Sequence, residues 1–287
     1  MRDEKKKALN SSLIPHPSSL RAKKSLGQNF LVDERVVDRI INALDPREDE
    51  TVVEIGAGRG ALTSRLIERA GRVVAIEFDR DLVSWLREQF GASENFTLVE
   101  GDALSIDICA AIAPVTRARV VANLPYNIST AILQRLIAQR DCLAEMVLMM
   151  QREVVERITA PPASSERGFL SVLIEAYCAT ETLFDVAPGS FRPVPKVWST
   201  VVSLRPRSRM AAEARDEALL WRIVSAGFAQ RRKTIFNNLR AAPGDLRSLI
   251  ELKGGATRLL ATAQIEPQRR AETLTLEEWA RLSRALE

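Results

Sequence analysis

The stretch Arg119-Val120-Val121-Ala122-Asn123-Leu124-Pro125-Tyr126 decides how the rest of the chain is interpreted. Its small apolar residues indicate a buried parallel strand. Pro125 cannot donate a hydrogen bond to a sheet, so the strand should end before it. An asparagine amide, a carbonyl fixed by proline and an aromatic ring then meet at the carboxyl end of a strand. In open α/β sheets, ligands bind at this edge.

These residues suit methyl transfer to the exocyclic amine of a nucleic-acid base. That nitrogen is a poor nucleophile because its lone pair is delocalised into the ring. The side-chain oxygen of Asn123 and the carbonyl of Leu124 can accept the amine hydrogens and turn the lone pair toward an electrophile. Tyr126 can stack on a flipped base. The alternative is a strand followed by an Asx turn and a core tyrosine, and the remaining sequence must decide between the two.

Composition sets the limits of the interpretation. The 287 residues, 46% hydrophobic and 27% charged, suffice for a large α/β domain and a smaller one. A net charge of +4 does not by itself indicate nucleic acid, so local clusters of basic residues matter more. Cys109, Cys142 and Cys178 lie far apart in sequence without metal-ligand spacing, which predicts a reduced, cytoplasmic protein with no metal. No apolar run is long enough for a membrane span.

A glycine-rich turn follows the strand predicted at residues 51–55. Gly56 and Gly58 let the backbone approach a ligand closely before a helix begins at Ala61. This spacing also fits a dinucleotide fingerprint, but Glu54 and the acidic residues further on argue against one.

Two more predicted strands end in carboxylates. Glu77, near the end of the strand at 72–78, can bind two ribose hydroxyls, and Asp102, after the strand at 96–100, can accept from the amino group of an adenine. Either residue alone could have only a structural role. Together with the glycine turn they predict a nucleoside across the carboxyl edge of the sheet.

The amino-terminal region divides into two parts. Residues 1–22 have the composition of a disordered basic arm. Lys23 and Lys24 are candidates for RNA phosphates, and Asn29 and Leu31 are placed to close over a ligand, although a hydrophobic staple at the entry of the next helix also explains Leu31.

The second half of the chain carries two further candidate segments. The Pro-rich loop at 191–200 should be stiff and present Phe191 to the reacting base and Lys196 to RNA. It joins an edge strand at 180–186 to the seventh strand at 201–204, these two running antiparallel to the rest. Beyond residue 206 the pattern is helical, and Arg231, Arg232 and Lys233 are predicted on a helix that binds phosphates.

In this order, the segments resemble the small-subunit ribosomal RNA adenine dimethyltransferases, in particular the bacterial kasugamycin-sensitivity dimethylases. The resemblance runs from about residue 22 to the end and rests on KKSLGQNFL, VEIGAGRGALT, AIEFDRDL, GDAL, NLPYNIST, MMQREVVERI, FRPVPKVWSTVVSL and FAQRRKTIFNNL. The related macrolide-resistance methyltransferases share the core around residues 123–130. The longer matches at 191–202 and 228–239 favour the dimethylases.

The resemblance implies a Rossmann-like class I methyltransferase domain at residues 23–206, with a seven-stranded mixed sheet, and a small helical RNA-binding domain at 207–287. S-adenosylmethionine would contact Asn29, Leu31, Gly56, Gly58, Glu77, Asp102 and Asn123. Asn123, Leu124, Pro125, Tyr126 and Phe191 would form the catalytic site. The implied reaction is dimethylation of two adjacent adenines in a hairpin loop near the 3′ end of the small-subunit RNA. The implied partner is the immature small subunit, with the enzyme acting as a monomer.

Two other classes of protein remain as alternatives. A dinucleotide oxidoreductase would share the glycine turn but leave the Asn-Leu-Pro-Tyr sequence and the basic segment without a role. A non-catalytic ribosome-assembly factor would retain the fold, and the intact residues 123–126 argue against it.

Overall fold

The computed structural model describes residues 20–287, so residues 1–19 of the predicted basic arm lie outside the described part. Within residues 20–287, none of the helices combines the length and apolar character needed to cross a membrane. The chain forms two compact units. Unit 1 comprises the residues up to Met149 with Val186–Trp198, and unit 2 comprises Met150–Asp185 with Ser199–Glu287.

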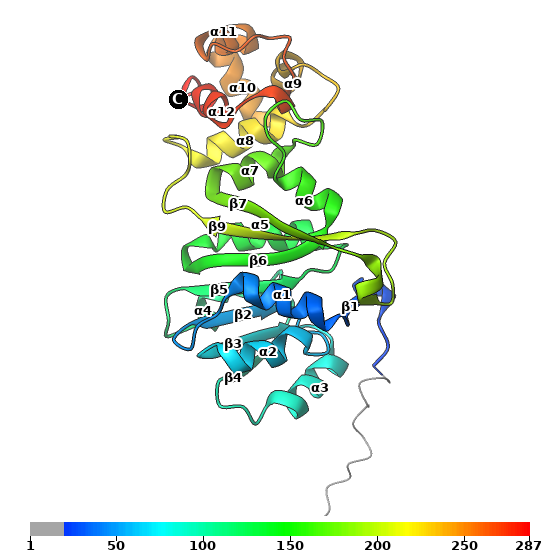
Figure 1. Ribbon diagram of the computed structural model, residues 1–287. Helices are drawn as coiled ribbons and strands as arrows, with labels where there is room; N and C mark the ends of the chain where they lie inside the picture. Colours follow the sequence, from blue (N-terminus) through cyan, green and yellow to red (C-terminus); the bar gives the residue numbers. More distant parts are fainter. Residues whose placement is uncertain (1–19) are drawn as a thin grey trace, which may run out of the picture. The chain divides into compact units, whose positions relative to one another are not determined.

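A seven-stranded sheet has the strand order β4-β3-β2-β5-β6-β9-β7 (Figure 1). Its strands are β2 (Thr51–Ile55), β3 (Arg72–Glu77), β4 (Phe96–Glu100), β5 (Ala118–Asn123), β6 (Leu143–Gln151), β7 (Cys178–Val186) and β9 (Ser199–Pro206). Strands β2 to β6 pair in parallel, and Ile55 lies opposite both Ile76 and Ala122. The carboxyl ends of β2, β3 and β5 are therefore level. The predicted α/β fold with seven strands in its sheet and an edge strand near 180–186 is confirmed.

Helices flank the parallel strands of unit 1. They are α1 (Glu34–Leu44), α2 (Ala61–Arg69), α3 (Arg80–Phe90), α4 (Ile108–Ala111) and α5 (Ser129–Ala138). In Figure 1, α1 and α2 lie on the near face of these strands and α5 on the far face. As predicted, Asp33 caps α1: its carboxylate accepts the N–H of Arg35 at 3.1 Å.

A short ribbon in unit 1 was not predicted. It pairs β1 (Phe30–Leu31) with β8 (Phe191–Arg192) in antiparallel fashion, with Leu31 opposite Phe191. Two residues per strand are too few for a recognisable alternation in the sequence. The ribbon joins the segment before α1 to the Pro-rich loop.

Unit 2 contains more than the predicted carboxyl-terminal helices. Its helices are α6 (Arg152–Ile158), α7 (Phe169–Tyr177), α8 (Glu217–Gly227), α9 (Ile235–Arg240), α10 (Gly244–Leu252), α11 (Gly255–Thr262) and α12 (Leu276–Arg284). Tyr177 of α7 donates to Glu217 of α8 at 2.5 Å and accepts from Trp221 at 2.8 Å. Because α7 packs on α8 and α12, the compact unit begins at residue 150. The boundary predicted at residue 206 falls inside it.

The predicted basic helix is wrong in its first half. Residues 228–234 form a turn between α8 and α9, so Arg231, Arg232 and Lys233 are exposed on a turn. Local hydrogen bonds explain the break. The Asn238 side-chain amide donates to the carbonyls of Gly227 at 2.5 Å and Gln230 at 3.1 Å, which satisfies backbone groups that would otherwise bond along a continuous helix.

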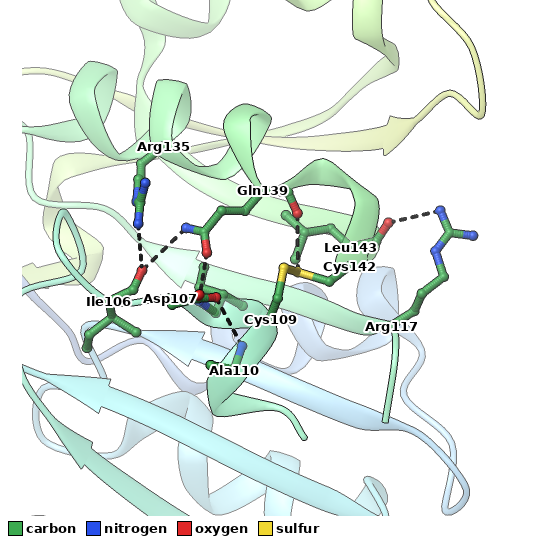
Figure 2. Close-up of a disulfide and its surroundings, with 10 residues drawn as sticks. Ile106, Asp107, Cys109, Ala110, Arg117, Arg135, Gln139, Cys142 and Leu143 are labelled. Carbon is green, nitrogen blue, oxygen red and sulfur yellow. Dashed lines mark hydrogen bonds between the residues drawn. A yellow bond between two sulfur atoms is a disulfide. The ribbon is translucent and has the colours of Figure 1, made fainter. Parts of the chain in front are cut away.

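The expectation that the cysteines are reduced is also wrong. Cys109 of α4 and Cys142 form a disulfide, with their Cα atoms 5.5 Å apart (Figure 2). The 33-residue sequence separation hides this proximity. Cys109 lies shortly before β5, and Cys142 immediately precedes β6. Because β5 and β6 are parallel neighbours, the segments that enter them lie at the same end of the sheet. Cys178 is buried and takes no part in this disulfide.

Hydrogen bonds around the disulfide join the same two segments. The Gln139 side chain accepts the N–H of Ile108 at 2.7 Å. It also donates to the carbonyl of Ile106 at 3.4 Å, as Figure 2 shows. Arg72 donates to the Ile112 and Ala113 carbonyls at the end of α4. The connection that follows Asp102 is thus fixed to the end of α5.

Candidate active site

A cavity of about 300 Å³ lies in unit 1 at the carboxyl ends of β2, β3, β4 and β5. Four groups of predicted residues converge there: the glycine turn, Glu77, Asp102 and the Asn-Leu-Pro-Tyr sequence. The amino-terminal segment adds a further wall. The principal lining residues are Ser25, Leu26, Gly27, Gln28, Asn29, Phe30, Gly56, Gly58, Glu77, Phe78, Asp102, Asn123, Leu124, Pro125 and Tyr126. The volume falls at the lower end of the range for small-molecule sites.

The glycine turn brings bare backbone to the cavity. Gly56 and Gly58 have φ of 72° and 60°, in the left-handed region that favours glycine. A Cβ built on Gly56 would meet no atom within 4 Å. The side of Gly56 that a side chain would occupy is therefore open, and a ligand can approach the backbone there.

Glu77 lies at the end of β3 with its carboxylate fixed by three backbone N–H groups. Gly58 donates to Oε2, while Phe78 and Asp79 donate to Oε1, each at 2.9 Å. Burial is the largest influence and raises the pKa of Glu77 above its ordinary value, although these hydrogen bonds oppose the rise. Oε1 accepts two of these N–H groups, whereas Oε2 accepts one and retains acceptor capacity for a ligand hydroxyl.

Glu54 is a second buried carboxyl, on β2 just before the glycine turn. It accepts from the Thr63 hydroxyl at 2.5 Å, which ties the strand before the turn to the helix after it. Burial is the main cause that raises the pKa of Glu54 to about 8. We therefore expect Glu54 to be protonated at neutral pH.

Asp102 follows β4 and lines the same cavity. Its Oδ1 accepts the N–H of Leu104 at 2.9 Å, which fixes the side chain in the turn. Hydrogen bonds among residues 20–287 use this oxygen and leave Oδ2 available for a donor on a ligand.

Among the residues that the structure describes, one hydrogen bond orients the Asn123 amide. Its Nδ2 donates to the backbone carbonyl of Asn29 at 3.1 Å. A carbonyl can only accept, so the amide nitrogen must face Asn29 and Oδ1 stays available as an acceptor. The N–H of Leu124 donates to the Met149 carbonyl at 3.0 Å, and within residues 20–287 no hydrogen bond uses the Leu124 carbonyl. The two predicted acceptors are both present.

Several predicted site residues lie away from the cavity. Phe191 is 0% exposed and pairs with Leu31, itself buried; neither belongs to the cavity lining. Phe191 therefore cannot contact a base directly in this conformation, because its ring packs inside unit 1. Its location instead indicates support for the ribbon that carries Phe30.

The predicted RNA-binding residues fall into two groups. Lys196, Arg231, Arg232 and Lys233 are exposed, Lys196 in unit 1 and the others in unit 2. Arg231 donates to the Ser165 carbonyl. Lys23 forms ion pairs with Asp79 at 2.5 Å and with Asp81 at 2.8 Å, so these carboxylates already neutralise its charge. The side chain of Lys24 lies outside the described part.

Phe78 was missed by the sequence interpretation. Its ring is 58% exposed and lines the cavity immediately after Glu77. An apolar ring exposed beside a buried carboxylate suits a flat heterocycle. The signal was its position directly after a carboxylate at a strand end.

This combination defines a class I, S-adenosylmethionine-dependent methyltransferase: a parallel sheet, an open glycine turn, carboxylates at two strand ends and an oriented Asn-Leu-Pro-Tyr sequence. The chain belongs to the ribosomal RNA adenine dimethylase family, whose sequence model matches residues 19–284. Its activity is S-adenosylmethionine-dependent dimethylation of adenine in ribosomal RNA.

Individual relatives agree with this assignment. The chain is 41% identical over 263 residues to ribosomal RNA small subunit methyltransferase A of Hahella chejuensis, covering 92% of each chain. Identity to the protein of the same name from Geobacter metallireducens is 43% over 270 residues, covering 93% of this chain and 96% of the other.

Two solved structures are similar in fold. A dimethyladenosine transferase from Plasmodium falciparum has a TM-score of 0.70 at 23% identity, with 88% of this chain and 95% of the other covered. The 23S rRNA methyltransferase ErmE has a TM-score of 0.65 at 26% identity, with 90% and 99% covered.

Proposed function

We propose that this enzyme dimethylates two adjacent adenines in a hairpin loop near the 3′ end of the small-subunit ribosomal RNA. Its relatives named small subunit methyltransferase A support the choice of subunit. The observation that carries the proposal is the orientation of Asn123, which leaves its Oδ1 and the Leu124 carbonyl as two acceptors beside the cavity. An amine with two hydrogens is the group that two such acceptors suit.

The cavity fits the cofactor at three places. Glu77 offers a fixed carboxylate to the ribose hydroxyls, the open side of Gly56 admits close approach, and Asp102 offers an acceptor to the adenine amine. Asn29 lines the same wall, and the Phe78 ring can stack on the heterocycle. When bound, the cofactor supplies an electrophilic methyl group.

The residues of the chain contribute mainly by positioning. Asn123 and Leu124 accept the N6 hydrogens of the target adenine and turn its lone pair toward the methyl group. Pro125 fixes the Leu124 carbonyl, and Tyr126 stacks on the flipped base. A strong base is unnecessary because the methylated amine is acidic and releases its proton to water. A loop target costs less to unstack than a base within a duplex.

RNA binding is assigned to exposed basic residues. Lys196 on the Pro-rich loop of unit 1 and Arg232 and Lys233 on the α8–α9 turn are suited to phosphate contacts. Residues 207–287 thus carry part of the proposed RNA-binding surface, and the Pro-rich loop carries the rest. The partner is the immature small ribosomal subunit, and the enzyme acts on it as a monomer.

Transfer of a radiolabelled methyl group tests the proposal. Purified enzyme is incubated with labelled S-adenosylmethionine and small subunits from cells that lack the modification, and the labelled nucleotides are mapped. We expect label as dimethyladenosine at two adjacent loop positions. Subunits that already carry the modification are the matched control and should accept no label. Label at other positions of the small-subunit RNA, or no label at all, would contradict the proposed substrate.

A further inference from the structure

One wall of the cavity is formed by a segment with little regular backbone pairing. Residues 20–31, here called the strap, contain a 3₁₀ turn (Lys24–Leu26) and the two-residue strand β1. Ser25 to Phe30 line the cavity. Gly27 within the strap has a φ of 63°. The strap is therefore held to unit 1 largely by side chains.

Asp79 is the principal partner of the strap. Its side chain is 2% exposed at the start of α3. Oδ1 receives Lys23 Nζ at 2.5 Å, and Oδ2 receives Gln28 Nε2 at 2.9 Å. The Gln28 amide also accepts the backbone N–H of Lys23 at 2.8 Å. One buried carboxylate thus binds both ends of the turn in the strap.

The same residue also contacts the proposed ribose site. The backbone N–H of Asp79 donates to Glu77 Oε1 at 2.9 Å. Three further contacts, made by two side chains, hold the ends of the strap. Arg59 donates to the Leu20 carbonyl and lies 4.3 Å over the Phe30 ring, and Asn123 donates to the Asn29 carbonyl. Through its backbone N–H, Asp79 thus connects the strap to the Glu77 carboxylate that would bind the cofactor.

Asp79 also serves α3 as its N-cap, since Oδ1 accepts the N–H of Asp81 at 3.1 Å. A helix cap needs only an acceptor, which asparagine supplies equally well. The charge and the second acceptor oxygen are needed for the strap, where one donor is an ammonium and the other an amide. A neutral amide in place of the carboxylate retains the cap and loses the attraction to Lys23.

We propose that Asp79 is a positioning residue for the cofactor. Its carboxylate anchors the strap as a wall of the cavity, and detachment of the strap from Asp79 lets the product S-adenosylhomocysteine leave. The inference rests on the proposed function, because it takes the cavity to be the cofactor site. It assigns Lys23 to the anchor in place of the RNA contact that the sequence suggested. Asp79 itself lies outside the cavity lining and acts through Lys23, Gln28 and Glu77.

Dissociation of S-adenosylhomocysteine from the full chain tests the anchor. In Asp79→Asn the dissociation rate should rise about tenfold, the scale expected for losing one charge-assisted hydrogen bond. Lys23→Met removes the other partner of the contact and should also raise the dissociation rate. Because Lys23 is exposed, we expect this variant to fold. The double variant should show less than the sum of the two single changes, because both remove the Lys23–Asp79 contact, while Lys23→Met also removes the pair with Asp81 and Asp79→Asn also removes an acceptor of Gln28.

Hydrogen exchange provides the second readout. Backbone amides of residues 20–29 should exchange faster in both variants while those of β2 and β3 stay unchanged. Arg65→Met is the matched control, since it removes the ion pair between Arg65 and Asp38, 3.2 Å long and away from the cavity lining. It should alter neither the dissociation rate nor exchange in the strap.

The outcomes separate the two proposals. If the parent enzyme fails to bind S-adenosylhomocysteine, the cofactor site itself is misassigned. If the parent binds it and Lys23→Met matches the parent in dissociation rate and in strap exchange, the anchor is refuted and the proposed function stands. Additive effects of the two substitutions would likewise refute the contact as the cause.

Discussion

The cavity has two kinds of wall. The sheet side is made of strand ends whose carboxylates and carbonyls are fixed by backbone hydrogen bonds, as at Glu77 and Leu124. The strap is fixed mainly by side chains, with Lys23 43% exposed at its anchor. Backbone bonds within a sheet open only when much of the structure opens, whereas side-chain contacts at a surface open locally. The sheet side is therefore suited to orienting the reaction, and the strap to exchanging the cofactor.

Asn123 belongs to both walls, since its oxygen serves the sheet side and its nitrogen holds the strap. Asn123→Ala should lower the methylation rate about 10²–10³-fold, the scale for losing one preorganised polar contact in catalysis. The measurement is single-turnover kinetics at saturating cofactor and RNA, which removes the contribution of the strap to binding. RNA affinity should barely change because phosphate contacts dominate it. An unchanged rate would mean that residues 123–126 have only a structural role.

The disulfide joins the segments that enter β5 and β6, two neighbouring strands of the sheet. Replacing both Cys109 and Cys142 by serine should lower the free energy of unfolding by about 2–4 kcal/mol, because the unfolded chain regains the freedom of the closed loop. Urea unfolding of parent and variant, each with and without a reductant, measures this. Reductant should bring the parent to the level of the variant and leave the variant unaffected. Equal stability of oxidised and reduced parent would show that the disulfide does not stabilise the fold.

The last prediction concerns the buried Glu54 under the glycine turn. Its folded-state pKa of about 8 exceeds the ordinary value, so its contribution to stability is complete at low pH and is lost as pH rises toward 8. Between pH 5 and 8 the parent should lose stability with a slope of at most about 1.4 kcal/mol per pH unit from this group. Glu54→Gln, which keeps an acceptor for Thr63, should show a flatter dependence in urea unfolding. If the parent and the variant show the same pH dependence of stability, Glu54 is not the group that titrates.

The sequence predicted the sheet side of the cavity well. The strand at 51–55 and the positions of Glu77 and Asp102 follow from apolar runs and from the rule that parallel strands end at one edge. Such features depend on local patterns plus one topological regularity. The structure places them around one cavity as expected.

Features that depend on side-chain partners far along the chain were not predictable in this way. The pairing of Lys23 with Asp79 joins residues 56 positions apart, and nothing in the lysine pair itself distinguishes an anchor from an RNA contact. The basic turn at 231–233 looked helical because its composition favours a helix, but the Asn238 side chain bonds to carbonyls of the turn and Thr234 caps the start of α9. Tertiary packing likewise determines that Phe191 is buried and lies away from the cavity.

The division of the chain into two units has a consequence for dissecting the protein. The backbone passes between the units three times, at residues 149–150, 185–186 and 198–199. Neither unit is thus encoded by one continuous stretch of gene. A fragment that starts at residue 207 would leave behind α6, α7, β7 and β9, and the cut surface of α8 and α12 would expose apolar side chains that α7 covers in the whole protein. Transplanting the basic turn into another methyltransferase would therefore require grafting a discontinuous set of segments.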